Sequence, residues 1–379
     1  MQGNAVCRPN DLPGQIVLVL QGGGALGSYQ AGVYQALHEA GIEPDWVIGT
    51  SIGAINASLI AGNAPENRLA RLKQFWKRME QTPAWTLRTG VPGFDDKLAY
   101  WSTVTNGIAG FFRPNLAAHA GESYPLGADR AAYYSTAPLE NTLRELVDFD
   151  LANRGAPRLT VGAAHVGTSQ MRYFDSRDGE LTVKHIMASG ALPPAFPAVR
   201  IDGELYWDGG ILSNSPTEAV FDDNPRRDSP IFSAHLCNSI GAEPTTMGEV
   251  LNRHKDVMYA SRITSQIERQ QQAHRLRHVI NELAARLPES ERTDAAVRDL
   301  IGYGCSTRMH VVRLLAPQLD RETHTKDVDF SPSGIMQRWD AGYAHTRSVL
   351  ARAPWIGEFD PLSGVVLHEH VDEMPMAAE

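Results

Sequence analysis

The chain has 379 residues, of which 42% are hydrophobic and 21% charged, and its formal net charge is −9. These values are typical of a soluble globular enzyme and allow one large α/β domain with additions. The acidic balance argues against a nucleic-acid-binding protein, which needs a basic face, and against strong electrostatic attachment to anionic lipid.

The cysteines and the N-terminal segment bear on the cellular compartment. The three cysteines (Cys7, Cys237 and Cys305) are widely spaced and odd in number, so neither a disulfide framework nor a metal-ligand spacing is indicated. Residues 1–14 lack the apolar core of a signal peptide, and no apolar run approaches the ~18 residues of a spanning helix. We therefore expect a cytoplasmic protein, at most peripheral at a membrane, with a short N-terminal tail.

Hydrophobic patterning predicts alternating strands and helices in the first part of the chain. The run at 15–20 (QIVLVL) is typical of a strand buried on both faces. A second strand is predicted at 45–48. Helices are predicted at 28–40, 52–61 and 66–79.

The pattern changes between residues 82 and 134, where aromatic residues mix with Gly, Pro and Asn and no period holds. One interpretation is an irregular insertion packed over the core. The other is a cap that forms an acyl-binding groove or contacts a membrane.

The α/β alternation then resumes, with strands predicted at 158–164, 203–208 and 231–236 and helices at 138–147 and 183–189. A long helical stretch with an apolar stripe follows at 246–287, then a strand at 309–316 and a helix at 333–351. The Pro/Glu-rich tail from residue 354 is expected to be poorly ordered at its end. The sequence therefore predicts a mostly parallel three-layer domain over 15–242 and a largely helical C-terminal extension over 243–379.

The segment Gly49–Gly53 (GTSIG) matches the nucleophile elbow G-x-S-x-G, and it lies between a predicted strand and a predicted helix. A serine on such a strained turn needs glycine two residues to either side, because side chains there would collide with neighbouring backbone. Ser51 would also lie at a helix N-terminus, whose dipole favours developing negative charge. The structural alternative is a tight turn with a helix-capping serine.

The segment 22–27 (GGGALG) also fits G-x-G-x-x-G, the dinucleotide-binding fingerprint. A nucleotide-binding domain should place an acidic residue at the end of its second strand. That strand here ends in Gly-Thr-Ser, and Asp45 lies before it. We therefore favour an oxyanion hole, formed by the N–H groups of Gly23, Gly24 and Ile52.

A reactive serine needs a base. None of the 13 histidines lies in a recognisable catalytic turn. Asp208, by contrast, ends an apolar strand and is followed by two glycines. Such an aspartate accepts the serine proton directly if desolvation raises its basicity. The alternative is an ordinary Asp-Gly turn.

Four ordered matches then carry a resemblance. They are the glycine loop after the first strand, G-x-S-x-G some thirty residues later, the ASGALPPAFP segment at 188–197, and Asp-Gly-Gly at 208–210 followed by Asn-Ser-Pro at 214–216. In this order, over residues 15–220, the chain resembles the patatin-like phospholipase family.

The resemblance implies a three-layer α/β/α sandwich and non-specific lipid acyl hydrolysis, including phospholipase A-type cleavage. It implies Ser51 as nucleophile, Asp208 as its base without a histidine, and Gly22, Gly23 and Gly24 as the oxyanion hole. No metal or organic cofactor is expected. Many family members place Arg or Lys where this chain has Leu26, so neutral esters are favoured here as substrates.

Two other functions stay open from the sequence. One is a catalytically silent scaffold or binding protein on the same fold, and the other is an α/β-hydrolase with a Ser-Asp-His triad. The expected partners are a lipid or other acyl ester and, transiently, a membrane surface, with no nucleic acid. The C-terminal helices allow oligomerisation.

Overall fold

The computed structural model describes residues 12–81, 102–121, 123–155, 157–237, 241–319 and 324–369, with the side chains of 260–264 excepted. Most of the predicted N-terminal tail and residues 82–101 of the predicted cap segment lie outside these ranges. The end of the C-terminal tail, from residue 370, lies outside them as well.

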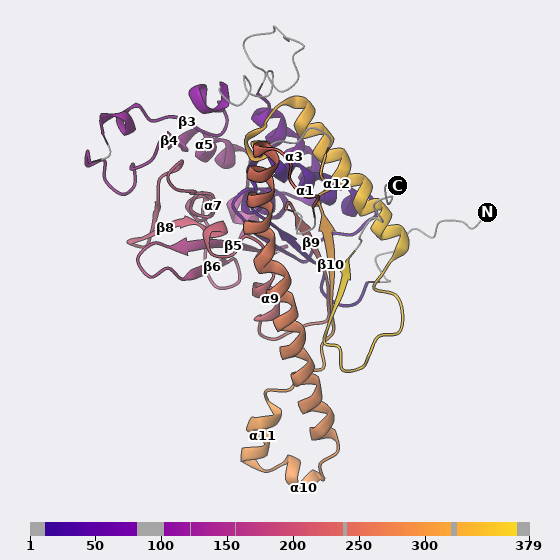
Figure 1. Ribbon diagram of the computed structural model, residues 1–379. Coiled ribbons are helices and arrows are strands. Elements are labelled where there is room, and N and C mark those ends of the chain that lie inside the picture. Colours follow the sequence, from indigo (N-terminus) through magenta and orange to yellow (C-terminus); the bar gives the residue numbers. More distant parts are fainter. Residues whose placement is uncertain are drawn as a thin grey trace, which may run out of the picture.

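A nine-stranded sheet forms the centre of the described structure (Figure 1). Its strands are β1 (Val17–Leu20), β2 (Trp46–Thr50), β5 (Arg158–His165), β6 (Met171–Asp175), β7 (Val199–Ile201), β8 (Glu204–Asp208), β9 (Ser229–His235), β10 (Met309–Leu315) and β11 (Val365–Glu369). Their order is β11-β10-β9-β1-β2-β5-β8-β7, and β6 also pairs with β5. All neighbours from β11 to β5 are parallel, whereas β6, β7 and β8 pair antiparallel. The predicted mostly parallel sheet is confirmed.

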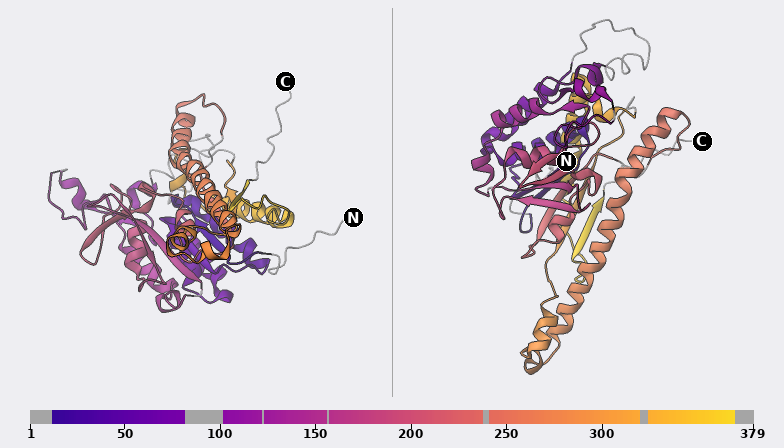
Figure 2. Two further views of the ribbon diagram at one scale, coloured as in Figure 1. Left: turned by 90° about the horizontal axis from the view of Figure 1, so that it is seen from below. Right: turned by 90° about the vertical axis from the view of Figure 1, so that its left-hand side faces the viewer.

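Helices cover both faces of this sheet (Figures 1 and 2). One face carries α1 (Ser28–Glu39), α2 (Ile52–Ala61), α3 (Pro65–Met79), α5 (Ala137–Leu146), α7 (Val183–Ser189) and α12 (Pro332–Arg352), and the other carries α8 (Glu218–Phe221) and α9 (Met247–Ala285). Successive side chains of a strand point to opposite faces. Accordingly, Leu18 packs in the core of the first face, whereas Val17 packs with Phe221 and Ile267 on the second. The predicted three-layer α/β/α sandwich is confirmed.

The C-terminal third is largely helical, as predicted, but it also completes the sheet. Its strands β10 and β11 extend the sheet beyond β9. The sheet therefore contains strands from both sides of the predicted domain boundary at residue 243. Strand β11 lies in the tail, where no strand was predicted. The far end of α9 projects away from the sheet and carries α10 (Glu289–Arg292) and α11 (Ala295–Ile301) (Figure 1).

The described part of the predicted cap segment has little regular structure. It contains a 3-10 turn (Leu116–Ala120) and the two-residue strand β3 (Arg113–Pro114), which pairs with β4 (Tyr134–Ser135). Phe111 and Phe112 of this segment are buried in the main core. The described residues therefore form an irregular insertion that packs over the core. Its aromatic side chains reach the cavity described below.

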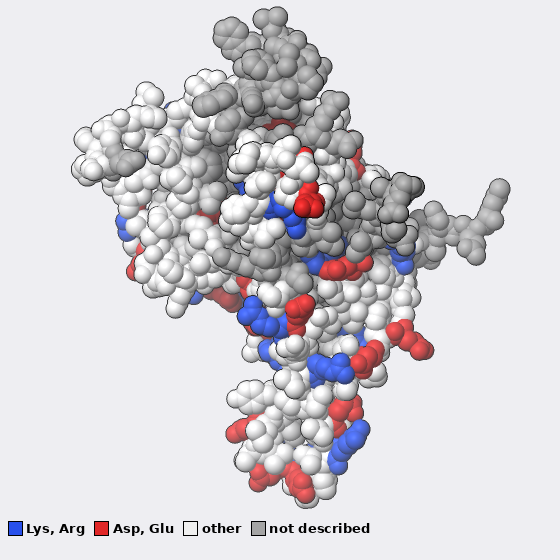
Figure 3. Space-filling view, in the orientation of Figure 1, with Lys and Arg blue, Asp and Glu red and all other residues white. Residues whose placement is uncertain are grey.

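The surface around α9 carries mixed charge. Over the described part of the face in Figure 3, Lys and Arg side chains alternate with Asp and Glu, and no broad area has one sign. None of the helices in the described ranges combines the length and the apolar character that crossing a bilayer would require.

The contact between α1 and α12 generates a stability prediction. A Cβ on Gly32 would lie 1.9 Å from the Trp339 carbonyl oxygen, and a Cβ on Gly342 would lie 2.1 Å from that of Tyr29. We expect Gly342→Ala to lower the free energy of unfolding by about 1–3 kcal/mol, because the helices must separate to admit the methyl group. Urea unfolding measures this.

Gly248→Ala is the matched control, because a Cβ on this helical glycine of α9 would lie 4.0 Å from Thr246 Oγ1, an ordinary contact distance. It should be neutral or stabilising by up to about 1 kcal/mol. Equal effects of the two substitutions would contradict the close-packing explanation.

Candidate active site

Ser51 occupies the strained turn that the G-x-S-x-G pattern predicts. It lies between β2 and α2 with φ 57° and ψ −124°, in the region that non-glycine residues rarely adopt. A Cβ on Gly49 would lie 2.2 Å from the Gly53 carbonyl oxygen, and one on Gly53 would lie 2.1 Å from that of Leu20. Both flanking glycines are therefore required by close backbone approach, and the elbow geometry is confirmed.

A serine of α7 holds this turn in place. The Ser51 N–H donates to Ser189 Oγ at 3.0 Å, and the Ser189 hydroxyl donates to the Gly162 carbonyl of β5 at 2.6 Å. Ser189 is completely buried. Sequence reasoning placed Ser189 in a family-like segment but missed this role, because the hydrogen bond joins residues 138 positions apart.

The sheet brings Asp208 to Ser51. In the register of the strands, Thr50 of β2 pairs with Gly162 of β5, and the next β5 residue, Ala163, pairs with Asp208 of β8. The Ser51 hydroxyl donates a hydrogen bond to the Asp208 carboxyl. The two residues predicted as nucleophile and base thus lie in contact, although they are far apart in the sequence.

The environment of Asp208 makes its carboxyl a stronger base than usual. The residue is only 2% exposed, and burial raises the pKa of its carboxyl from 3.8 to about 6. The hydrogen bonds from Ser51 and from the Gly210 N–H, which lies 2.7 Å from Oδ1, oppose that rise of the pKa. Near neutral pH this group is mostly ionised and still able to accept a proton.

The glycine loop between β1 and the 3-10 turn η2 (Gly24–Gly27) faces the elbow, since a Cβ on Gly22 would lie 3.1 Å from Ser51 Cβ. The prediction that Gly22 donates its N–H group in the oxyanion hole is wrong. Its N–H donates to the Asn214 carbonyl at 3.1 Å, and Asn214 Nδ2 donates back to the Gly22 carbonyl at 3.1 Å. Gly22 therefore anchors the loop, and its N–H is not available to a substrate oxygen.

The remaining predicted donors are placed differently. Across the described ranges, no backbone or side-chain acceptor takes the N–H groups of Gly23, Gly24 or Ile52. All three residues line the same cavity as Ser51. Unpaired N–H groups at a helix N-terminus are suited to binding an anion.

Ser51 and Asp208 line a cavity of about 360 Å³ that is mostly apolar on one side. Phe112 packs against Tyr134 and Phe196 there, with ring centroids 4.9 and 5.3 Å away. The lining of the cavity also includes charged residues, among them Lys255, Asp256, Lys326 and Asp327. No histidine is among the described residues that line this cavity, and no group of three potential metal ligands occurs in the described ranges.

Comparison with known proteins identifies the family of the chain. A family model described as patatin-like phospholipase matches residues 18–221, more than half of the chain. The chain belongs to the patatin-like phospholipase family. A second model, described as patatin phospholipase, matches residues 257–362 and so covers much of the C-terminal third.

Several named relatives share the patatin-like region. Lysophospholipase nte1 of Aspergillus niger is 49% identical over 198 residues, which cover 52% of this chain and 10% of that protein. Patatin-like phospholipase domain-containing protein ZK370.4 of Caenorhabditis elegans is 27% identical over 54% of this chain and 12% of its own length. Triacylglycerol lipase ptl3 of Schizosaccharomyces pombe is 42% identical over 16% of this chain and 13% of its own length. The matches thus span only 10–13% of these three relatives.

Among solved structures, VipD from Legionella pneumophila is 16% identical, with a TM-score of 0.38 over 89% of this chain and 67% of that chain. The sheet and the family model, rather than this similarity, define the fold of this patatin-like protein.

Burial of Asp208 generates a prediction about stability and pH. Because the folded-state pKa is raised above the unfolded value of 3.8, the stability contributed by this group is fully present below pH ~4. It is lost as the pH rises through about 6. We expect Asp208→Asn, which stays neutral, to unfold with a free energy about 2–3 kcal/mol higher than wild type at pH 7.5, and we expect the difference to vanish near pH 4. Urea unfolding across this pH range measures it.

Asp178→Asn serves as the exposed control and should show no comparable pH-dependent difference. An Asp208→Asn variant that is less stable than wild type at pH 7.5 would contradict the buried-carboxylate account.

Proposed function

We propose that this patatin-like protein is a lipid acyl hydrolase that cleaves carboxylic esters through Ser51 and Asp208. One observation carries the proposal: the Ser51 hydroxyl donates to a buried carboxyl with a raised pKa, inside a largely apolar cavity. Relatives named as lysophospholipases and as a triacylglycerol lipase support the same chemistry.

The reaction would proceed in two steps. Asp208 takes the Ser51 proton while Oγ attacks the ester carbonyl, and the protonated carboxyl then donates that proton to the leaving alcohol. Water, deprotonated by the same carboxylate, next attacks the acyl-serine and releases the fatty acid. The N–H groups of Gly23, Gly24 and Ile52 would stabilise the oxyanion of each tetrahedral intermediate.

The aromatic wall indicates where the acyl chain lies. Phe111, Phe112, Tyr134, Phe196 and Phe330 line the cavity that contains Ser51. Burying an alkyl chain against these rings contributes about 0.8 kcal/mol per CH₂ group. This favours acyl esters with several methylenes over short-chain esters, and it gives the aromatic residues of the irregular insertion a binding role.

The two other functions left open by the sequence find less support. A catalytically silent scaffold does not require a serine in a strained turn beside a buried carboxylate, and both features lower the stability of the folded protein. A Ser-Asp-His triad would need an imidazole beside Ser51. The described lining of the cavity contains none.

We expect Ser51→Ala to abolish labelling by a fluorophosphonate probe and to lower ester hydrolysis by about 10³-fold or more, because the attacking oxygen is removed. Asp208→Asn should lower hydrolysis comparably, because the variant side chain cannot accept the proton. Labelling on a gel and hydrolysis of a long-chain ester measure both.

Ser58→Ala is the matched control, because Ser58 is a buried serine of α2 whose hydroxyl donates to the Ile55 carbonyl. It should label and hydrolyse like wild type. Near-normal turnover by Asp208→Asn would overturn the dyad, and a wild-type protein that neither labels nor hydrolyses would favour the silent scaffold.

The pH profile provides a second test. Since the base must be ionised, kcat/KM should fall tenfold per pH unit below the Asp208 pKa of about 6 and should level off above it. An uncharged ester measured from pH 4.5 to 8.5 reports this without titration of the substrate. A profile that stays flat down to pH 4.5 would exclude Asp208 as the base.

A further inference from the structure

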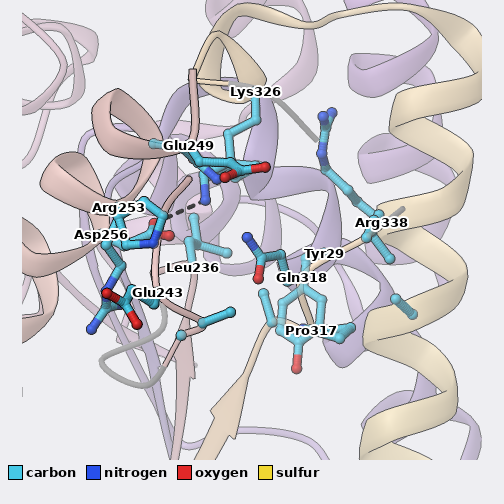
Figure 4. A pocket seen from close by; sticks show the side chains of 18 residues that line it. Tyr29, Leu236, Glu243, Glu249, Arg253, Asp256, Pro317, Gln318, Lys326 and Arg338 are labelled. Carbon is cyan, nitrogen blue, oxygen red and sulfur yellow. Dashed lines mark hydrogen bonds and ion pairs between the residues drawn. The ribbon is translucent and has the colours of Figure 1, made fainter. Parts of the chain in front are cut away.

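A second cavity of about 250 Å³ adjoins the catalytic cavity, and we call it the side chamber (Figure 4). It lies between α1, the first turns of α9, the segment after β10, and α12. Leu26, Asp256 and Lys326 line both cavities, so the two spaces meet at these residues. The side chamber is built largely from the C-terminal third of the chain.

Lys326 is a buried cation at this junction. Its Nζ lies 2.8 Å from Asp256 Oδ1, the pair that the dashed line in Figure 4 marks, and the two side chains are 7% and 8% exposed. An ammonium group has three donors. Asp256 is the one acceptor of Lys326 among the described residues. Two donors of this buried group are therefore free to meet a ligand.

The turn that carries Lys326 packs directly on the glycine loop. The 3-10 turn η5 (Lys326–Val328) contacts η2, and a Cβ on Gly24 would lie 2.3 Å from the Asp327 carbonyl oxygen. Gly24 has a φ of 56°. Lys326 itself lines the catalytic cavity that Gly23, Gly24 and Ile52 also line. The expectation of neutral ester substrates rests on Leu26 alone and does not consider this cation.

A buried polar atom in the side chamber lacks a partner. Asn252 of α9 is 5% exposed and lines the chamber, and its Oδ1 accepts no hydrogen bond from any residue that the structure describes. An unpaired buried acceptor is costly unless a ligand supplies a donor.

The formal charges around the chamber balance, with three acidic and three basic lining residues: Glu243, Glu249 and Asp256 against Arg253, Lys326 and Arg338. A balanced lining with a free acceptor and a cation with spare donors fits a group that carries both an anion and a donor. An inorganic anion without a hydroxyl group would leave Asn252 Oδ1 unpaired.

We propose that the side chamber binds the phosphate-bearing head group of an acyl ester whose acyl chain lies in the catalytic cavity. Lys326 donates to the phosphate, and Asn252 Oδ1 accepts from a hydroxyl or other donor in the alcohol part of the head group. The inference rests on the proposed hydrolysis at Ser51 and assigns the leaving-group side of that substrate to residues of the C-terminal third.

The test compares two esters with the same acyl chain, a 1-acyl-glycerophosphocholine and a 1-monoacylglycerol. Lys326→Gln alone would leave Asp256 buried without its partner, so the double variant Lys326→Gln/Asp256→Asn replaces the ion pair by a neutral hydrogen-bonded pair. We expect its kcat/KM to fall about tenfold or more further for the phosphorylated ester than for the monoacylglycerol, mainly through KM, because only the first ester carries the phosphate.

The control variant Lys77→Gln/Glu80→Gln removes one charge of each sign from a partly exposed ion pair at the C-terminal end of α3 and should change neither value. Thermal unfolding confirms that both double variants fold. Equal losses on the two esters would make Lys326 a structural residue, and no loss on either would mean that the chamber is unused. A wild-type protein that hydrolyses neither ester would instead refute the proposed function.

Inhibition separates a head group from free phosphate. Glycerophosphocholine should inhibit wild-type hydrolysis of the monoacylglycerol, and Asn252→Ala should weaken this inhibition. Inorganic phosphate at the same concentration should inhibit less. If inorganic phosphate inhibits equally well and Asn252→Ala has no effect, the head-group assignment is wrong.

Discussion

The site depends on the contact between the Ser51 hydroxyl and a carboxylate withdrawn from water. A solvated aspartate is a weak base, whereas burial raises the pKa of Asp208 toward neutrality and makes proton transfer from a serine feasible. The same burial lowers the stability of the folded protein. The sheet holds the two residues together, because Ser51 follows β2, Asp208 ends β8, and β5 pairs with both strands. The Ser51 hydroxyl and the Gly210 N–H then donate to the carboxyl.

Hydrogen bonds to α7 and β5, together with one pair of bonds between two loops, hold the segments around this contact. Ser189 connects the elbow to β5, and Asn214 holds the Gly22 carbonyl and N–H. These bonds occupy the N–H groups of Ser51 and Gly22, whereas those of Gly23, Gly24 and Ile52 have no acceptor within the described part of the chain. A set of donors that is already oriented needs little reorganisation when negative charge develops.

The C-terminal third contributes to the structure in two ways. It adds β10 and β11 to the sheet and packs α12 on α1 at glycine contacts, so it shares the core of the patatin-like region. Its η5 turn also presses on the glycine loop and brings a buried cation to the junction of two cavities. Ser51 lies in the segment that the first family model matches and Lys326 in the segment that the second matches, whereas Asn252 lies between the two segments.

The sequence by itself determined the sandwich, the elbow, and the choice of Ser51 and Asp208, because glycine spacing and apolar runs report local backbone requirements. It missed β11, the role of Ser189, and Lys326 as a cation near Leu26. It also counted Gly22 as a donor, although the carbonyl that takes its N–H belongs to Asn214, 192 positions later. Such partnerships were decided by the tertiary structure alone, because hydrogen bonds and burial depend on which distant segments become neighbours, and a local pattern carries no record of that.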